Sequence, residues 1–151
     1  MVAPLLQAQV DINAPAAKVW ALISDFRRMP DWSPQCRWMK AFGPLRAGTR
    51  TVNLNRRNRV LWTTTCTVLE VIPEKKLAFR VNTNHTIWSY ELEPNGERTR
   101  VTESRHAENG VTAFSNLAVN AFLGGTTNFE NELIAGMKAS LANIKAAAER
   151  R

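Results

Sequence analysis

Residues 77–106, with the sequence LAFRVNTNHTIWSYELEPNGERTRVTESRH, contain the clearest strand pattern in the chain. Apolar and polar side chains alternate along the first two strands of this stretch, with apolar residues at Leu77, Phe79 and Val81 and then at Trp88, Tyr90 and Leu92. Such period-two alternation predicts strands with one face toward a core. Turn-forming residues at 82–85 and 94–96 separate the strands by short loops. Strands this close in sequence predict an antiparallel meander.

The same pattern extends toward the N-terminus. From residue 35 onward, further turn signals occur at 43–48, 57–58 and 73–74, and the segments between them are rich in Val, Thr, Trp and Phe. Residues 7–13 also alternate, which predicts a separate first strand. The chain is therefore expected to form seven antiparallel strands.

Two short helices are expected after the first strand. Pro15 suits the first turn of a helix, because its missing N–H costs nothing there. An apolar stripe at helical spacing follows, formed by Val19, Leu22, Ile23 and Phe26. Pro30 and Pro34 should end this helical region, with a compact turn at 31–33 between them.

A long helix is expected at the end of the chain. Gly124 and Gly125 should kink or break it, and Thr127 followed by Glu130 predicts a capping box that restarts it. The apolar stripe before the kink is Phe114, Leu117, Ala118, Ala121 and Phe122, and the stripe after it is Phe129, Leu133, Met137, Leu141, Ile144 and Ala148. The second piece, roughly 36 Å long, could cross the whole sheet and cover its apolar face. This order predicts an α+β fold in which the sheet curls around the C-terminal helix.

The bulk composition fits a single intracellular domain over residues 1–151. The length is usual for one domain. No run approaches the roughly 18 apolar residues of a membrane span, and the first ten residues lack the pattern of a signal peptide. Two cysteines, Cys36 and Cys66, provide no disulfide framework, which favours a reducing compartment such as the cytoplasm.

The formal net charge of +7 and the pI of about 10.1 raise the question of a nucleic-acid or anionic-membrane partner. The basic residues are scattered, however, and most fall in expected turns or at helix ends. A solvated basic surface is the favoured interpretation, and nucleic-acid binding is the disfavoured one.

The sequence offers no metal or cofactor site. The candidate metal ligands Cys36, Cys66, His85 and His106 lack the spacing of known metal motifs, and Cys66 in a Thr-rich segment is typical of core packing. The sequence contains no motif for an activated nucleophile. It also lacks a glycine-rich phosphate loop, because Gly124 and Gly125 fall within an expected helix and not after a strand. We therefore expect no metal and no cofactor.

Short segments and single residues along the chain resemble those of a known protein family. They are Ile12–Pro15, Val19–Trp20, Asp25, Trp32–Pro34, Val68, Glu70, Leu77, Phe79, Trp88–Tyr90, Leu92, Thr99 and Val101. With the order of elements, they resemble the START-like or Bet v 1-like (SRPBCC) superfamily, and within it the bacterial polyketide cyclase/dehydrase and lipid-transport family. The resemblance implies a helix-grip fold with an internal cavity. It also implies hydrophobic ligands, such as lipids or polyketides, and enzymatic activity in a minority of members.

Aromatic residues supply the candidate wall of that cavity. One sheet curled around one helix encloses more volume than ordinary side chains fill, so a pocket is expected between them. A fully packed core remains the alternative for each residue. The predicted lining residues are Trp62, Phe79, Trp88, Tyr90, Phe114, Phe122, Phe129 and Met137.

Polar side chains are expected at one end of the cavity. If Val101 points inward, alternation brings Thr99, Glu103 and Arg105 inward as well. Glu103 and Arg105 would need partners there, either each other or Arg50 or Arg56, unless fraying leaves them in water. In an enzyme, Glu103, Arg105 and Tyr90 would move protons.

The resemblance also places a mouth beside the loops at 55–59 and 82–86. Arg56, Arg59 and His85 would then form a basic rim. Such a rim suits an amphiphile with an acidic head, or docking on an anionic membrane, and a plain solvated hairpin is the alternative.

Two functions follow as hypotheses. The leading one is a noncatalytic carrier or sensor of a hydrophobic small molecule. The other is a cyclase, aromatase or dehydratase acting on a polyketide-like substrate. Either a monomer or a homodimer fits the sequence.

Overall fold

The computed structural model describes residues 5–107 and 126–150, without the side chains of 126–129. The expectations for the stripe from Phe114 to Phe122, for Gly124 and Gly125, and for the side chain of Phe129 lie outside this part. The elements are β1 (Leu5–Ile12), α1 (Ala16–Ile23), the 3-10 helix η1 (Phe26–Arg28), α2 (Met29–Trp32), β2 (Cys36–Ala41), β3 (Arg50–Arg57), β4 (Val60–Ile72), β5 (Lys76–Val81), β6 (Ile87–Asn95), β7 (Arg98–His106) and α4 (Thr126–Ala148).

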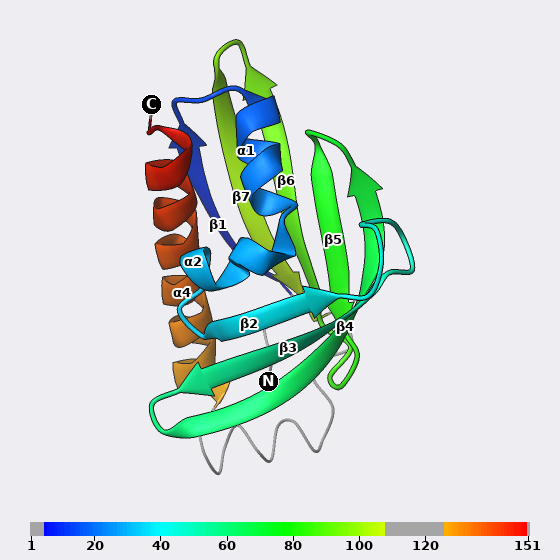
Figure 1. Ribbon diagram of the computed structural model, residues 1–151. Helices are drawn as coiled ribbons and strands as arrows, with labels where there is room; N and C mark the ends of the chain where they lie inside the picture. The colour runs from blue at the N-terminus through cyan, green and yellow to red at the C-terminus, as the bar shows by residue number, and fades with distance from the viewer. Residues whose placement is uncertain (1–4, 108–125, 151) are drawn as a thin grey trace.

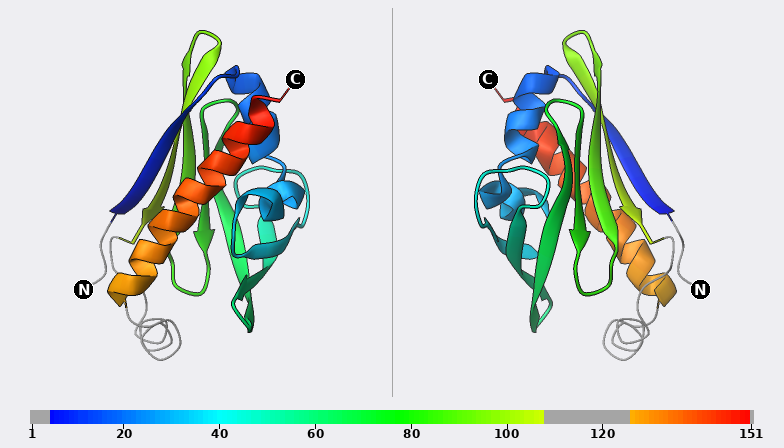
Figure 2. Two further views of the ribbon diagram at one scale, coloured as in Figure 1. Left: turned by 90° about the vertical axis from the view of Figure 1, so that its left-hand side faces the viewer. Right: turned by 90° about the vertical axis from the view of Figure 1, so that its right-hand side faces the viewer.

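The seven strands form one antiparallel sheet, as predicted, in the order β1-β7-β6-β5-β4-β3-β2. The register shifts once in β4, between Val68 and Glu70, and once in β2, between Cys36 and Trp38. Such bulges bend a strand and help a sheet to curl. Helix α4 crosses one face of the curled sheet (Figure 1), and Figure 2 shows that it runs diagonally. The predicted sheet curled around a C-terminal helix is confirmed.

The apolar core lies between the C-terminal half of α4, the short helices and the sheet. Met137, Leu141 and Ile144 recur at spacings of four and three, so they share one face of α4, and all three are almost fully buried. They pack in one cluster with residues of β1, β5 and β7, including Ile12, Leu77 and Val101. The Asn143 side-chain amide donates a hydrogen bond of 2.9 Å to the backbone carbonyl of Trp32, which ties α4 to α2.

One local expectation is wrong. Pro30 does not end the helical region, because it sits in the first turn of α2, where its missing N–H leaves no helical hydrogen bond unmade. The expected turn at 31–33 is therefore partly helix. Helix α4 is described from Thr126 onward, and the Thr127 side chain of the expected capping box lies outside the described part. Within the described residues, no helix is both long and apolar enough to cross a membrane.

Candidate ligand-binding pocket

A cavity of about 490 Å³ lies between the inner face of the sheet and the middle of α4. Helix α4 lines this space with Glu132, Leu133 and Met137 and, between them, with the small residues Ala135, Gly136 and Ser140, which leave room beside the helix. A Cβ atom built on Gly136 would meet no atom within 4 Å. The pocket thus adjoins the packed core formed by the rest of the helix.

Most of the predicted lining residues within the described part lie in this wall. They are Trp62, Phe79, Trp88, Tyr90 and Met137, together with Glu103 and Arg105. Phe79 is held by an edge-to-face contact with Phe26, with ring centroids 6.0 Å apart and an interplanar angle of 78°. Phe114, Phe122 and the side chain of Phe129 lie outside the described residues.

Glu103 and Tyr90 form a buried acid–phenol pair in the wall of the pocket. They sit directly opposite each other in the register of β6 and β7, and their side chains hydrogen-bond. Burial raises the pKa of Glu103 to about 8, against an opposing effect of the Tyr90 hydrogen bond. Burial, and then the charge of Glu103, raise the pKa of Tyr90 well above its ordinary value. At neutral pH both groups are therefore largely protonated and uncharged.

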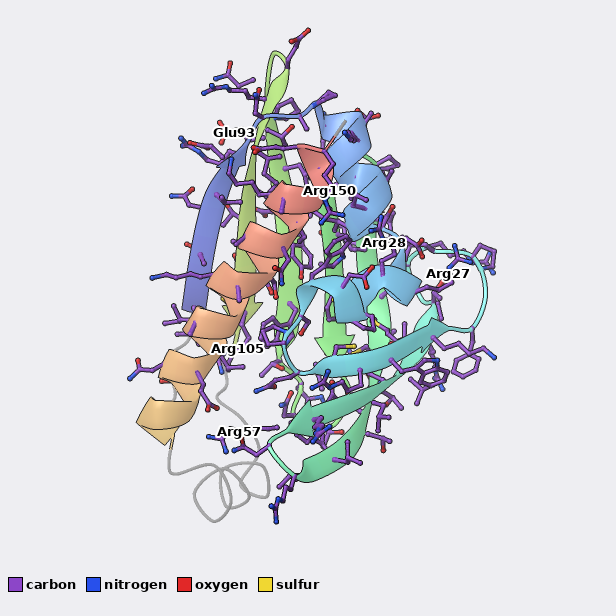
Figure 3. The ribbon with its side chains drawn as sticks, turned by 60° about the vertical axis from the view of Figure 1, so that its left-hand side comes forward. Arg27, Arg28, Arg57, Glu93, Arg105 and Arg150 are labelled. Atoms are coloured by element: carbon purple, nitrogen blue, oxygen red, sulfur yellow. The ribbon has the colours of Figure 1, made fainter. Side chains whose placement is uncertain are left out.

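Arg105 points inward two residues further along β7 and is almost fully buried, as alternation predicts. Its Nη2 lies 3.2 Å from Oε2 of Glu130 on α4 (Figure 3). The expected pairing of Arg105 with Glu103 is wrong, because the carboxylate that Arg105 meets belongs to Glu130 on the helix that covers the sheet. Glu103 meets Tyr90 rather than Arg50 or Arg56. The ion pair of Arg105 with Glu130 compensates a charge that would otherwise be costly to bury.

A ladder of polar side chains on β3 and β4 was not foreseen from the sequence. Asn53 donates from Nδ2 to Sγ of Cys66 at 3.2 Å, and its Oδ1 accepts a bond of 3.0 Å from Thr51. Asn55 donates from Nδ2 to Oγ1 of Thr64 at 3.0 Å. The sequence did contain a signal for this ladder, because the odd-numbered residues of β3 share one face of the strand. Only the register of the sheet shows that this face is the one that meets the pocket.

Burial raises the pKa of the Cys36 thiol, which also lines the pocket, to about 11. This cysteine is therefore a neutral part of the wall at physiological pH.

The β3–β4 hairpin reaches α4 through Arg57 rather than through the predicted rim residues. Nε and Nη2 of Arg57 each donate a bond of 2.7 Å to the carboxylate of Glu132, which borders the pocket (Figure 3). Arg56 instead folds onto its own turn, with Nε donating to the backbone oxygen of Asn58 at 2.7 Å. Arg59 and His85 are exposed, and none of the three predicted rim residues lies in the pocket wall.

The sequence matches the model of one protein family over residues 4–149, and that family is described as polyketide cyclase / dehydrase and lipid transport. The chain belongs to this family. The resemblance inferred from the sequence is thus confirmed, and the helix-grip fold of the polyketide cyclase/dehydrase family agrees with the curled sheet and its closing helix. No curated protein matches the sequence.

Solved structures share the fold over nearly the whole chain. A polyketide cyclase-like protein from Corynebacterium glutamicum has a TM-score of 0.66 at 25% identity, with 96% of this chain and 91% of that one covered. The Zhui aromatase/cyclase from a Streptomyces species has a TM-score of 0.71 at 17% identity, with 97% and 94% covered. The di-domain aromatase/cyclase StfQ of the steffimycin pathway has a TM-score of 0.77 at 12% identity, with 97% of this chain and 50% of that one covered. The latter two likenesses concern the fold alone.

Proposed function

We propose that this member of the polyketide cyclase/dehydrase family binds a small, largely apolar molecule between α4 and the sheet. The observation that carries the proposal is the cavity of about 490 Å³. Small-molecule sites usually have volumes of roughly 300–1,000 Å³, with mostly apolar walls and a few placed polar groups. Here Trp62, Trp88 and Met137 supply apolar wall, and Asn53 and Glu103 supply polar groups.

The electrostatics of the wall favour an uncharged ligand over the acidic-headed amphiphile considered from the sequence. Glu103 is largely protonated at neutral pH and can donate a hydrogen bond. The charges of Arg105 and Arg57 are balanced by Glu130 and Glu132. A ligand carrying hydroxyl or carbonyl groups, such as a phenol or a hydroxyketone, would find donors without bringing an uncompensated charge into the pocket.

Ligand binding can be tested by filling the cavity from the helix. Gly136→Leu adds a side chain where the pocket is open, without breaking the helix. Ala139→Leu adds the same side chain at an exposed position of α4 and serves as the control. Binding of neutral phenols and hydroxyketones, measured by calorimetry, should be lost in the first variant and kept in the second. Equal binding by both variants, or tighter binding of matched carboxylates, would count against the proposal.

A second candidate function, a cyclase, aromatase or dehydratase, is favoured by one specific observation. Glu103 has a pKa of about 8 and hydrogen-bonds Tyr90 inside the pocket, so it can exchange a proton near neutral pH. Two structural neighbours are named as aromatase/cyclases. Such an enzyme should convert a linear β-polyketone, and Glu103→Gln should abolish turnover while leaving binding intact. Unchanged turnover in that variant would exclude Glu103 as the acid or base.

A further inference from the structure

The positive charge of the chain is concentrated in one segment. Residues 32–69 contain seven arginines and lysines and neither Asp nor Glu. The remaining residues contain thirteen basic and thirteen acidic side chains, so the net charge of +7 equals that of this segment alone. The segment forms β2, β3 and most of β4, which are neighbours at the end of the sheet opposite β1 (Figure 1).

Three basic side chains of this segment, those of Lys40, Arg50 and Arg56, face away from the pocket, because side chains alternate between the two faces of a strand. On β3, Asn53 and Asn55 line the pocket, so the even-numbered residues between and beside them face outward. Arg50 and Arg56 therefore lie on the outer face, and both are exposed. On β2, Met39 lines the pocket and Lys40 faces outward. Within the described part of the chain, Lys40, Arg50 and Arg56 form no salt bridge.

Large apolar side chains are exposed among these charges. Trp38 is 48% exposed, and Phe42 and Leu61 are each 60% exposed. Leu61 pairs with Arg56 across the β3–β4 hairpin, and Lys40 lies 5.8 Å from the centre of the Phe42 ring. We call this surface the outer basic face, formed by Trp38, Lys40, Phe42, Arg50, Arg56 and Leu61. Several large apolar side chains exposed on one face of a sheet are typical of an interaction site rather than of plain solvated surface.

We propose that the outer basic face docks on an anionic lipid membrane, with Lys40, Arg50 and Arg56 over the head groups and Trp38, Phe42 and Leu61 entering the interface. Tryptophan is enriched at membrane–water interfaces because its ring is amphipathic. Basic residues close to an anionic bilayer are attracted by its negative surface potential. The face combines both features on one side of a curled sheet.

The same observations disfavour two other occupants. A second copy of the chain would bring the outer basic face against itself, and the arginines and lysines would repel each other. A nucleic acid offers phosphates, but the exposed aliphatic side chain of Leu61 at the hairpin gains nothing from phosphates and cannot stack on bases. The hydrocarbon boundary of a bilayer accommodates this side chain.

Docking would also bring the pocket close to the membrane. The hairpin that presents Arg56 and Leu61 also carries Arg57, which is bonded to Glu132 at the border of the pocket. A lipophilic ligand could then pass between bilayer and pocket over a short path. The docking proposal itself does not depend on the proposed ligand and can be tested without one.

The test is cosedimentation of the purified protein with vesicles made of equal parts phosphatidylcholine and phosphatidylserine, compared with phosphatidylcholine alone. The wild type should bind the anionic vesicles only, and added salt should weaken binding. The triple variant Lys40→Gln, Arg50→Gln, Arg56→Gln should bind about 100-fold more weakly, at about fivefold for each charge removed. These side chains are exposed, so the variant should fold, as circular dichroism will verify.

A matched control separates the outer basic face from net charge. The triple variant Lys75→Gln, Arg98→Gln, Lys138→Gln loses the same charge at exposed positions elsewhere and should bind like the wild type. Equal weakening in both triple variants would overturn the proposal, as would absence of binding to the anionic vesicles.

Two further measurements test the apolar part and the rival partner. Lipids with brominated acyl chains should quench tryptophan fluorescence, and Trp38→Phe should remove most of that quenching. Quenching that persists unchanged would mean that another surface docks. Tighter, face-dependent binding to single-stranded or duplex nucleic acid than to the vesicles would assign the surface to nucleic acid instead.

Discussion

Replacing Glu103 by Gln should remove a pH dependence of stability that burial of this carboxyl creates. Its pKa is about 8 in the folded protein, against an ordinary value of 4.5. The folded protein therefore holds the proton more tightly than the unfolded chain does. Stability from this group is fully present below pH 4.5 and is lost as the pH rises through 8.

The size of the effect follows from the two pKa values. Between about pH 6 and pH 9, linkage gives a loss of about 3 kcal/mol in the free energy of unfolding for the wild type. Glutamine has a similar shape and no titrating proton, so the Glu103→Gln protein should lack this part of the loss. Burial raises the pKa of Cys36 and Cys66 in both proteins, so their contribution cancels in the difference.

Urea unfolding at both pH values measures this difference. Glu97→Gln, at an exposed position in the turn before β7, is the control and should follow the wild type at both pH values. If the gap in unfolding free energy between wild type and Glu103→Gln is the same at both pH values, water reaches the Glu103 carboxyl and the group is not buried.

Three further changes test the core, the hairpin contact and the buried thiols. Leu141→Ala should lower the free energy of unfolding by about 2–5 kcal/mol, because Leu141 is almost fully buried in the core, and a loss below about 1 kcal/mol in urea unfolding would contradict that packing. Arg57→Ala should lower the free energy of unfolding by less than about 1 kcal/mol, because the ion pair with Glu132 is partly exposed. Ligand dissociation from this variant, measured by stopped flow, should be faster than from the wild type. An unchanged dissociation rate would show that the ion pair does not restrict ligand exit. Iodoacetamide should modify Cys36 and Cys66 slowly in the folded protein and quickly in urea, because burial raises the pKa of both thiols. Rapid modification of the folded protein would contradict the burial of the two cysteines.

The parts of the fold that depend on local pattern were predictable from the sequence. Alternation and turn chemistry identified the seven strands, because both act over a few residues. The inward direction of Glu103 and Arg105 followed from Val101, since side chains two apart on a strand share a face. Pro30 misled because a proline that ends one helix can equally begin the next.

The contacts of the site were harder to predict because they depend on how distant elements dock. Glu130 meets Arg105 only through the position of α4 over the sheet, which no local pattern encodes. Arg57 reaches the helix and Arg56 does not, because successive side chains along a strand point to opposite faces of the sheet. The acid-free segment 32–69 was readable in the sequence, but strand parity was needed to place its charges on one face.

The most direct measurement of the central claim is native mass spectrometry of the purified protein, followed by denaturing extraction. A ligand-binding pocket predicts a discrete small-molecule adduct on the wild type and on Ala139→Leu, and none on Gly136→Leu, where a leucine side chain enters the cavity. An adduct that persists on Gly136→Leu would place the bound molecule elsewhere. A wild type that carries no adduct, and that no neutral phenol or hydroxyketone stabilises, would contradict the proposed function.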